Sequence, residues 1–229
     1  MPKINSDNFG DINKSSFSIN EIVKYSDDIV KNCLSETIKN CKDGASVVLE
    51  LPTETYSNVN VSSAKFLIDS GYEGIYVSFQ RPFKNILSIF KNQGIDTNKM
   101  AFIDLATQCS IDEDESSYEC TDLSRSLNVE QLGKSVYSQI DKFKSNKIFI
   151  LIDSLNTLSL YKSSKDIVRF ADILVENINS HGSKNVVVLF SLAKDLCKKD
   201  FARHITYNAD QVINVEKYDH DVIHPNLLT

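Results

Sequence analysis

The sequence is poor in glycine and lacks tryptophan altogether. Only seven glycines occur among its 229 residues. Glycine lets a backbone approach a phosphate closely, so this scarcity argues against a phosphate site lined by backbone N–H groups. The sequence also has no apolar run near the roughly 20 residues of a transmembrane helix, and Met1–Ser18 lacks the pattern of a secretory signal. We therefore expect a cytoplasmic protein that makes no membrane contact.

Basic clusters and paired cysteines are scarce as well. The net charge is −6 and the pI is near 5.3. Because nucleic-acid binding requires a basic surface, we expect no nucleic-acid partner. The five cysteines are scattered without a C-x-x-C pair, which favours reduced thiols. A disulfide between Cys109 and Cys120, which flank an acidic segment, is the alternative.

The chain does contain a regular alternation of strand and helix patterns. Runs of Val, Ile and Leu alternate with segments whose apolar residues recur at helical spacing. Strands are expected at 47–51, 75–79, 100–105, 148–152, 186–190 and 211–215, and helices at 19–41, 61–70, 83–90, 129–143 and 167–178. Continuous apolar strands indicate a sheet that is buried on both faces. We expect an α/β fold with a doubly wound, mainly parallel sheet flanked by helices and joined by right-handed crossovers.

We see no linker that would divide this pattern. The expected organisation is a flexible arm at 1–17, a single α/β domain at 18–216 with an N-terminal helix, and a tail at 217–229. The acidic segment at 111–119 is interpreted as a solvated loop, with a docking site for a basic partner as the alternative.

Short motifs lie at the ends of several expected strands. They are Gly74–Phe79, Phe102–Asp104, Ile150–Leu158 and the late segment Asn208–Ile213. Their order resembles the RecA/KaiC-like P-loop ATPases, especially archaeal KaiC-like signal-transduction domains. The Ile-Asp-Ser-Leu-x-x-Leu run is the most specific motif, and the resemblance covers roughly residues 20–216. It implies a RecA-like P-loop fold with a nucleotide site after the first strand.

The segment Pro52–Asn60 lies where that family carries its glycine-rich, lysine-bearing phosphate loop. In an ungapped register, Thr53 and Asn58 take the places of the two glycines. Val59 then takes the place of the lysine, and Asn60 that of the Mg²⁺-binding hydroxyl residue. Val59 brings no charge to a phosphate, and Asn60 offers a carboxamide where a hydroxyl would hold the metal. A retained, degenerate nucleotide site would consist of Thr53, Asn58, Val59, Asn60, Asp153 and Ser154.

Other positions of the family's active site differ in how well this chain matches them. After the second strand the family usually has acidic residues, one of which activates water, whereas this chain has Gln80 and Arg81. Glutamine can orient a water molecule but cannot accept its proton. Asp153 takes the place of the family's Walker B aspartate, which helps to hold magnesium; the alternative is a strand-end residue that caps the next turn with Ser154. Ser191 ends the strand expected beside that of Asp153, in a sensor-like place or as a simple strand terminus.

The remaining polar residues form no recognisable catalytic set. His220 and His224 have metal-like spacing only in a helical tail, and Pro225 favours a flexible one. His181 and His204 have no Cys/His neighbours in the sequence, and no serine nucleophile motif is present that could use Asp195 and His204. A basic group is interpreted as one solvated helix face, with a partner or phosphate contact as the alternative: Lys194, Lys198, Lys199 and Arg203.

The leading hypothesis is a non-catalytic RecA/KaiC-like domain, a pseudo-ATPase that acts as a regulatory or signalling module by binding proteins. It predicts no catalytic residue, no metal and no cofactor, and its partner would be another protein, a second copy or an active KaiC-like paralogue. The alternative is a nucleotide-binding switch without efficient hydrolysis, in which ATP and Mg²⁺ are the cofactors and Asp153 contacts the metal. An unrelated enzymatic activity is a third hypothesis, although no paired carboxylates or activated nucleophile can be placed.

Overall fold

The computed structural model describes residues 19–40, 44–106, 119–120, 128–178, 184–197 and 199–215. In these ranges seven strands form one sheet in the order β4-β3-β2-β5-β6-β1-β7, and all adjacent pairs are parallel. The expected parallel sheet is therefore confirmed. The strands are β1 (Ala45–Leu51), β2 (Glu73–Ser78), β3 (Met100–Asp104), β4 (Glu119–Cys120), β5 (Lys147–Asp153), β6 (Asn185–Ala193) and β7 (Gln211–Asn214).

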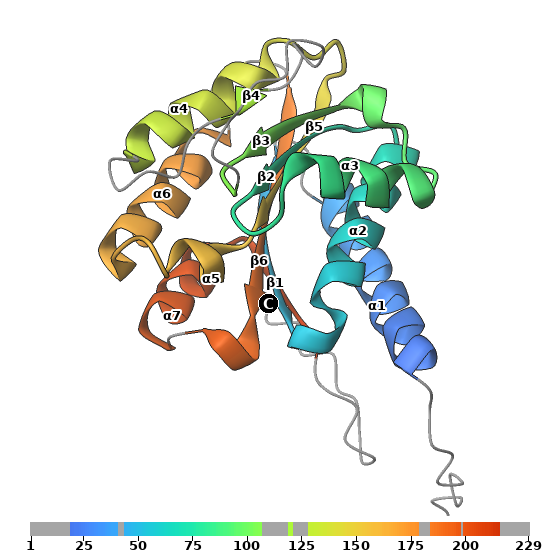
Figure 1. Cartoon of the computed structure of the whole chain (residues 1–229), viewed down its shortest axis with the longest axis horizontal. Helices are drawn as coiled ribbons and strands as arrows, with labels where there is room; N and C mark the ends of the chain where they lie inside the picture. The colour runs from blue at the N-terminus through green and yellow to red at the C-terminus, as the bar shows by residue number, and fades with distance from the viewer. Residues whose placement is uncertain are drawn as a thin grey trace, which may run out of the picture.

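Helices cover both faces of this sheet (Figure 1). One layer contains α1 (Ile19–Asn40), α2 (Thr53–Asp69) and α3 (Phe83–Asn92), and the other contains α4 (Val129–Ile140), α5 (Leu155–Leu158), α6 (Ser164–Glu176) and α7 (Lys199–Asn208). Short 3-10 helices, η1 (Thr97–Lys99) and η4 (Lys194–Leu196), precede β3 and follow β6. The doubly wound α/β fold expected from the sequence is present.

The sheet separates two apolar cores, and alternate residues of each strand enter different cores. In β5, Phe149 and Leu151 pack with the layer of α1, α2 and α3, whereas Ile148, Ile150 and Ile152 pack with the layer of α4, α6 and α7. This alternation explains why β5 reads as an uninterrupted apolar run. A strand covered by helices on both faces has no side that tolerates polar residues.

The strand order brings the ends of four strands to one edge of the sheet, called here the carboxyl edge. β6 lies between β1 and β5, with Leu49 opposite Ser191, and β2 lies on the other side of β5, with Ser78 opposite Asp153. The expected place of the Ser191 strand, between the first strand and that of Asp153, is confirmed. Ligands of doubly wound folds bind outside this edge, where the strand order reverses.

The main correction concerns the segment after β1. We expected a loop at 52–60 and a helix from Val61, but α2 begins at Thr53, with Pro52 at its N-cap. Its buried face already includes Tyr56 and Val59, so the helical period starts two turns earlier than expected. The signal is weak in the sequence because Thr, Ser and Asn have low helix propensity, and tertiary packing overrides it here.

Several expectations concern residues outside the described ranges. They are the arm at 1–17, the tail at 217–229, the acidic segment at 111–119 apart from Glu119, a disulfide that involves Cys109, and the histidines His181, His220 and His224. Among the described residues, Cys33 and Cys197 have free thiols, and burial raises the pKa of Cys197 to about 11. None of the helices in these ranges combines the length and the apolar character needed to cross a membrane.

Candidate functional site

A buried polar network lies at the carboxyl edge, beneath α2. Asn60 on α2 is fully buried, and its amide contacts two strands. Its Nδ2 donates to Oδ1 of Asp153 on β5 at 3.4 Å, and the hydroxyl of Ser191 on β6 donates to its Oδ1 at 2.6 Å. A single amide group therefore connects α2 to both central strands.

Asp153 is the charged centre of this network. Only 4% of its surface is exposed, and the hydroxyl of Tyr76 on β2 donates to its Oδ2 at 2.5 Å. Burial raises the pKa of the Asp153 carboxyl, although Tyr76, Tyr56, the positive charge of Arg81 and Asn60 all act in the opposite direction. Burial also raises the pKa of Tyr76 well above its usual value, and the neighbouring Asp153 carboxylate adds to the shift.

Tyr56, in the first turns of α2, faces the same carboxylate. Its side chain is buried, and burial followed by the charge of Asp153 raises its pKa well above the usual value. Its hydroxyl lies near Asp153, Ser154 and Asn60, yet no described group completes a hydrogen bond of ordinary length and angle with it. The ring of Tyr56 packs in the apolar core beneath α2, and its hydroxyl lies beside the network.

A carboxylate of the chain itself lies at the amino end of α2. Asp195, in η4, accepts a hydrogen bond from the backbone N–H of Thr53 at 3.3 Å. The first N–H groups of a helix have no partner within the helix and carry partial positive charge, so they attract anions. Lys194, the preceding residue, donates to the side-chain oxygen of Asn214 and so fixes η4 against β7.

The structure brings together only some of the expected site residues. Asn60, Asp153 and Ser191 form one network, whereas Thr53 and Asn58 are exposed on α2. Val59 is fully buried in the core that α2 shares with the sheet.

Ser154 has a local role beside this network. It is the N-cap of α5, and its Oγ accepts a hydrogen bond from the N–H of Thr157 at 3.2 Å. Ser154 therefore caps the segment after the strand, whereas the carboxylate of Asp153 accepts hydrogen bonds from Asn60 and Tyr76. The peptide bond between Asp153 and Ser154 is cis.

Arg81 lies near the Asp153 carboxyl, at a place where the family usually has acidic residues. Its positive charge lowers the pKa of Asp153, while its own backbone N–H and carbonyl both bond to the hydroxyl of Ser78. Gln80 beside it is exposed. The other buried carboxylate at this edge, Asp104, accepts hydrogen bonds from the N–H groups of Phe83 and Ala106 at 2.8 Å each.

The sequence reasoning did not identify Tyr56 and Tyr76 as members of the site. A signal was present, because a tyrosine between apolar strand residues, such as Tyr76 between Ile75 and Val77, needs a partner for its buried hydroxyl. The carboxyl end of the neighbouring strand offers that partner. Only the pairing of β2 with β5 in the structure identifies this partner as Asp153.

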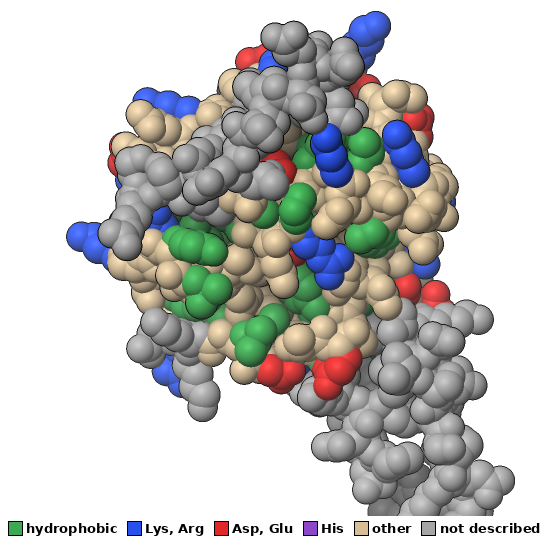
Figure 2. All heavy atoms as spheres, viewed as in Figure 1, with side chains coloured by type: hydrophobic (Ala, Val, Ile, Leu, Met, Phe, Trp, Pro, Cys, Tyr) green, Lys and Arg blue, Asp and Glu red, His purple; other side chains and the backbone are tan. Residues whose placement is uncertain are grey.

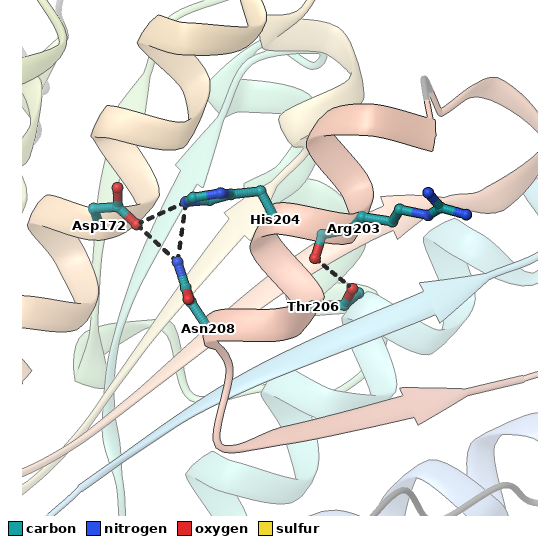
Figure 3. Close-up of polar contacts among 5 residues, drawn as sticks. All are labelled: Asp172, Arg203, His204, Thr206 and Asn208. Atoms are coloured by element: carbon teal, nitrogen blue, oxygen red, sulfur yellow. Dashed lines mark hydrogen bonds and ion pairs between the residues drawn. The ribbon is translucent and has the colours of Figure 1, made fainter.

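His204 belongs to a surface cluster between α6 and α7 (Figure 3). Its Nε2 lies 3.7 Å from Oδ1 of Asp172 and 3.0 Å from Nδ2 of Asn208, which itself donates to Asp172 at 3.4 Å. No serine takes part, in keeping with the absence of a nucleophile motif. Across the described residues, no group of three or more His, Cys, Asp or Glu side chains could hold a metal ion.

The prediction that the basic residues share one helix face is wrong for Lys194. Lys194 lies in η4, where it contacts Asn214, whereas Arg203 lies on α7. In Figure 3, the side chain of Arg203 points away from the Asp172–His204–Asn208 cluster. The two charges therefore belong to different elements of the carboxyl-terminal third of the chain.

Comparison with known proteins identifies the family. The family model described as "ATPase: KaiC" matches residues 61–218, which is well over half of the chain. The chain belongs to the KaiC ATPase family. The match begins directly after the segment 52–60, where the resemblance implied a phosphate loop. No curated protein matches the sequence.

Solved structures show the same KaiC-like fold. The KaiC-like protein PH0186 from the hyperthermophilic archaeon Pyrococcus horikoshii OT3 is 17% identical, with 76% of this chain and 74% of that chain covered and a TM-score of 0.52. The uncharacterized protein PH0321 from Pyrococcus horikoshii, whose crystal structure is a complex with an unknown peptide, is 14% identical, with 74% and 76% covered and a TM-score of 0.51. At these identities the similarity establishes the fold.

Proposed function

We propose that this KaiC-family chain is a pseudo-ATPase, a domain that does not hydrolyse ATP and acts as a regulatory or signalling module by binding proteins. The observation that carries the proposal is the arrangement of α2 and of the buried side chains at the carboxyl edge. α2 begins at Thr53, directly after β1, and the side chain of Asn60 joins Asp153 and Ser191 beneath it. These contacts among the chain's own groups, at the place where the resemblance implies a nucleotide, support the proposal.

The residues present do not fit the phosphates of ATP. A phosphate cradle needs an open loop with several outward-facing N–H groups and a lysine. Residues 53–60 instead belong to α2, and Val59, in the lysine position, is fully buried in an apolar core. The carboxylate of Asp195 lies at the amino end of α2, where it would repel a phosphate.

The residues do not fit a nucleotide-bound Mg²⁺ either. The ion requires nearly octahedral oxygen coordination at about 2.0–2.1 Å and normally keeps several waters. The two oxygens of Asp153 accept hydrogen bonds from Asn60 and Tyr76, and both ends of the Asn60 amide are engaged. Without a carboxylate in place of Gln80 or Arg81, the site also lacks the group that would accept a proton from the attacking water.

Binding of other proteins is the activity that these features leave open. The sheet and its two cores are complete, and function in such folds depends on the site and not on the scaffold. PH0321, which shares the fold, was crystallised with an unknown peptide. We propose a protein partner for this chain as well: an unrelated protein, a second copy, or an active KaiC-like relative.

Calorimetric titration of the full chain with Mg·ATP tests this proposal. We expect no heat of binding at nucleotide concentrations up to the millimolar range, for the wild type and for Asp153→Ala alike. Micromolar binding that Asp153→Ala abolishes would contradict the proposal. Such binding without release of phosphate would establish the alternative, a nucleotide-binding switch, which the retained Asp153 favours.

A further inference from the structure

Three polar side chains meet where α6 packs against α7 (Figure 3). Asp172 lies on α6, and His204 and Asn208 lie on α7. Nε2 of His204 is 3.0 Å from Nδ2 of Asn208 and 3.7 Å from Oδ1 of Asp172, and the amide nitrogen is 3.4 Å from the same carboxylate oxygen. No histidine side chain is visible among the described residues on the face drawn in Figure 2, so Figure 3 is the view that shows this group, named here the α6–α7 cluster.

Backbone packing fixes the positions of the three side chains. His204 and Asn208 are four residues apart on α7, so they share one face of that helix. Their neighbour Ile205 and the neighbour of Asp172 on α6, Ala171, are both buried in the core beneath the two helices. The cluster therefore starts from two helices that are already held in place. A site that is preformed in this way loses less conformational entropy when a ligand binds.

The hydrogen atoms of the cluster are shared unequally. The amide group of Asn208 donates to Asp172 and contacts Nε2 of His204, which must be unprotonated to accept a hydrogen bond from it. An imidazole nitrogen and a carboxylate oxygen thus both direct lone pairs at one small NH₂ group. The outer torsion of asparagine is broad and nearly two-fold, so the amide can turn and present its oxygen instead. Three lone-pair atoms then face one point, which suits a cation.

The distances between these atoms fit a transition-metal ion. Zn²⁺ binds histidine nitrogen and carboxylate oxygen at about 2.0–2.2 Å, which places the donors of a tetrahedral site about 3.4 Å apart. The three separations of 3.0, 3.4 and 3.7 Å bracket that value. Only two donors of the cluster are His or Asp, and the third is an amide. The side chains of His204 and Asp172 are 47% and 31% exposed, so water can reach the remaining coordination position.

The charges and donor types around the cluster also favour such an ion. The one carboxylate, Asp172, brings negative charge, and the guanidinium of Arg203 on α7 points away from the cluster in Figure 3. Imidazole is a good ligand for Zn²⁺, Ni²⁺ and Cu²⁺, whereas Mg²⁺ and Ca²⁺ are held by several oxygen ligands. A site with one imidazole and one carboxylate therefore selects a transition metal over Mg²⁺.

We infer that the α6–α7 cluster binds one divalent transition-metal ion through Nε2 of His204, Oδ1 of Asp172 and the side-chain oxygen of Asn208. The ion would join α6 to α7 and so hold the helix that connects β6 to β7. This site goes beyond the proposed function, since it involves neither a nucleotide nor a protein partner. It also adds a metal to a chain for which the leading hypothesis from the sequence predicts none.

Calorimetric titration of the chelator-treated, dialysed full chain with ZnCl₂ tests the inference. We expect His204→Gln and Asp172→Asn each to weaken binding by at least about tenfold, because even the loss of an outer-shell partner costs about 10–100-fold in metal affinity. Asn208→Asp replaces a neutral ligand by a carboxylate and should tighten binding by about tenfold. The matched control Tyr207→Asp adds the same charge at the adjacent exposed position and should leave the affinity unchanged.

Two further measurements separate this site from other binders of metal. Replacement of both His220 and His224 by Gln should preserve binding, and millimolar Mg²⁺ should not displace Zn²⁺. The inference is overturned if the wild type binds no Zn²⁺, if His204→Gln binds as tightly as the wild type, if the variant of the two tail histidines loses the site, if Mg²⁺ displaces Zn²⁺, or if Tyr207→Asp tightens binding as much as Asn208→Asp. The Mg·ATP titration contains no Zn²⁺, so each proposal can fail without the other.

Discussion

Asn60 bridges two strands through the two ends of its side-chain amide. A carboxamide has both a donor and an acceptor, so Asn60 can donate to Asp153 and accept from Ser191 at the same time. The side chain of Asn60 thus supplies an internal connection between α2, β5 and β6.

Asn60→Ala should destabilise the protein by about 2 kcal/mol, because it leaves Ser191 and Asp153 with unmet hydrogen-bonding groups in a buried site. Urea denaturation followed by circular dichroism measures the change. Asn58→Ala, on the exposed face of the same helix, is the matched control and should stay within about 0.5 kcal/mol. Equal effects of the two variants would show that the network contributes nothing to stability.

Asp153 should make stability depend on pH. Burial raises its pKa in the folded protein above the value of about 3.9 in the unfolded chain. Between these two pKa values the folded state keeps a proton that the unfolded chain has lost, so the free energy of unfolding falls as the pH rises through that window. Asp153→Asn cannot titrate, and its stability relative to the wild type should therefore increase with pH.

Urea midpoints of the wild type and Asp153→Asn, compared from about pH 4 upward, test this dependence. The isosteric change also alters the hydrogen bonds with Tyr76 and Asn60, which adds an offset that is nearly independent of pH. The slope of the difference is the diagnostic quantity. A constant difference across the range would mean that Asp153 titrates alike in the folded and unfolded states.

At the scale of elements, the first two turns of α2 separate what the sequence could predict from what it could not. The strands other than β4 and the helices α1, α3, α4 and α6 follow from apolar periodicity, and their expected bounds agree with the structure to within a few residues. β4 and α7 were not among the expected elements. The start of α2 does not follow from that pattern, because its buried face includes Thr55 and Asn60, which are polar. Only the sheet beneath the helix shows that these residues face inward.

Val59→Lys tests whether this helix could open into a phosphate loop. The side chain of Val59 is fully buried, so a lysine there would place an unpaired charge in the core, at a cost of about 3 kcal/mol or more. We expect a large loss of stability and no gain of ATP hydrolysis, measured by urea denaturation and phosphate release. The control Asn58→Lys on the exposed side should change stability by about 0.5 kcal/mol or less. Normal stability of Val59→Lys would indicate that the segment can leave the helix.

At the scale of the whole molecule, strand order decides which distant residues meet. The order β1, β6, β5, β2 could be expected from the family resemblance, and it places Ser191 between β1 and Asp153. The network itself joins residues that lie far apart in the sequence, such as Asn60 and Ser191, through side-chain rotamers that no periodicity encodes. The fold can therefore be predicted from the sequence pattern more readily than the site can. The side chains that meet at the carboxyl edge could be named only from the three-dimensional structure.

The proposed pseudo-ATPase predicts that the stability of the whole protein does not depend on nucleotide. A ligand present at 100 times its Kd stabilises the folded state by about 2.7 kcal/mol, which corresponds to a rise of roughly 5–10 °C in Tm for a chain of this size. We expect the Tm in millimolar Mg·ATP to equal the Tm in MgCl₂ alone. Differential scanning fluorimetry of the wild type and Asp195→Ala makes the measurement, since the variant removes the carboxylate at the amino end of α2. A rise of several degrees in the wild type would show that the edge opens for nucleotide, and a rise confined to the variant would show that Asp195 keeps it closed.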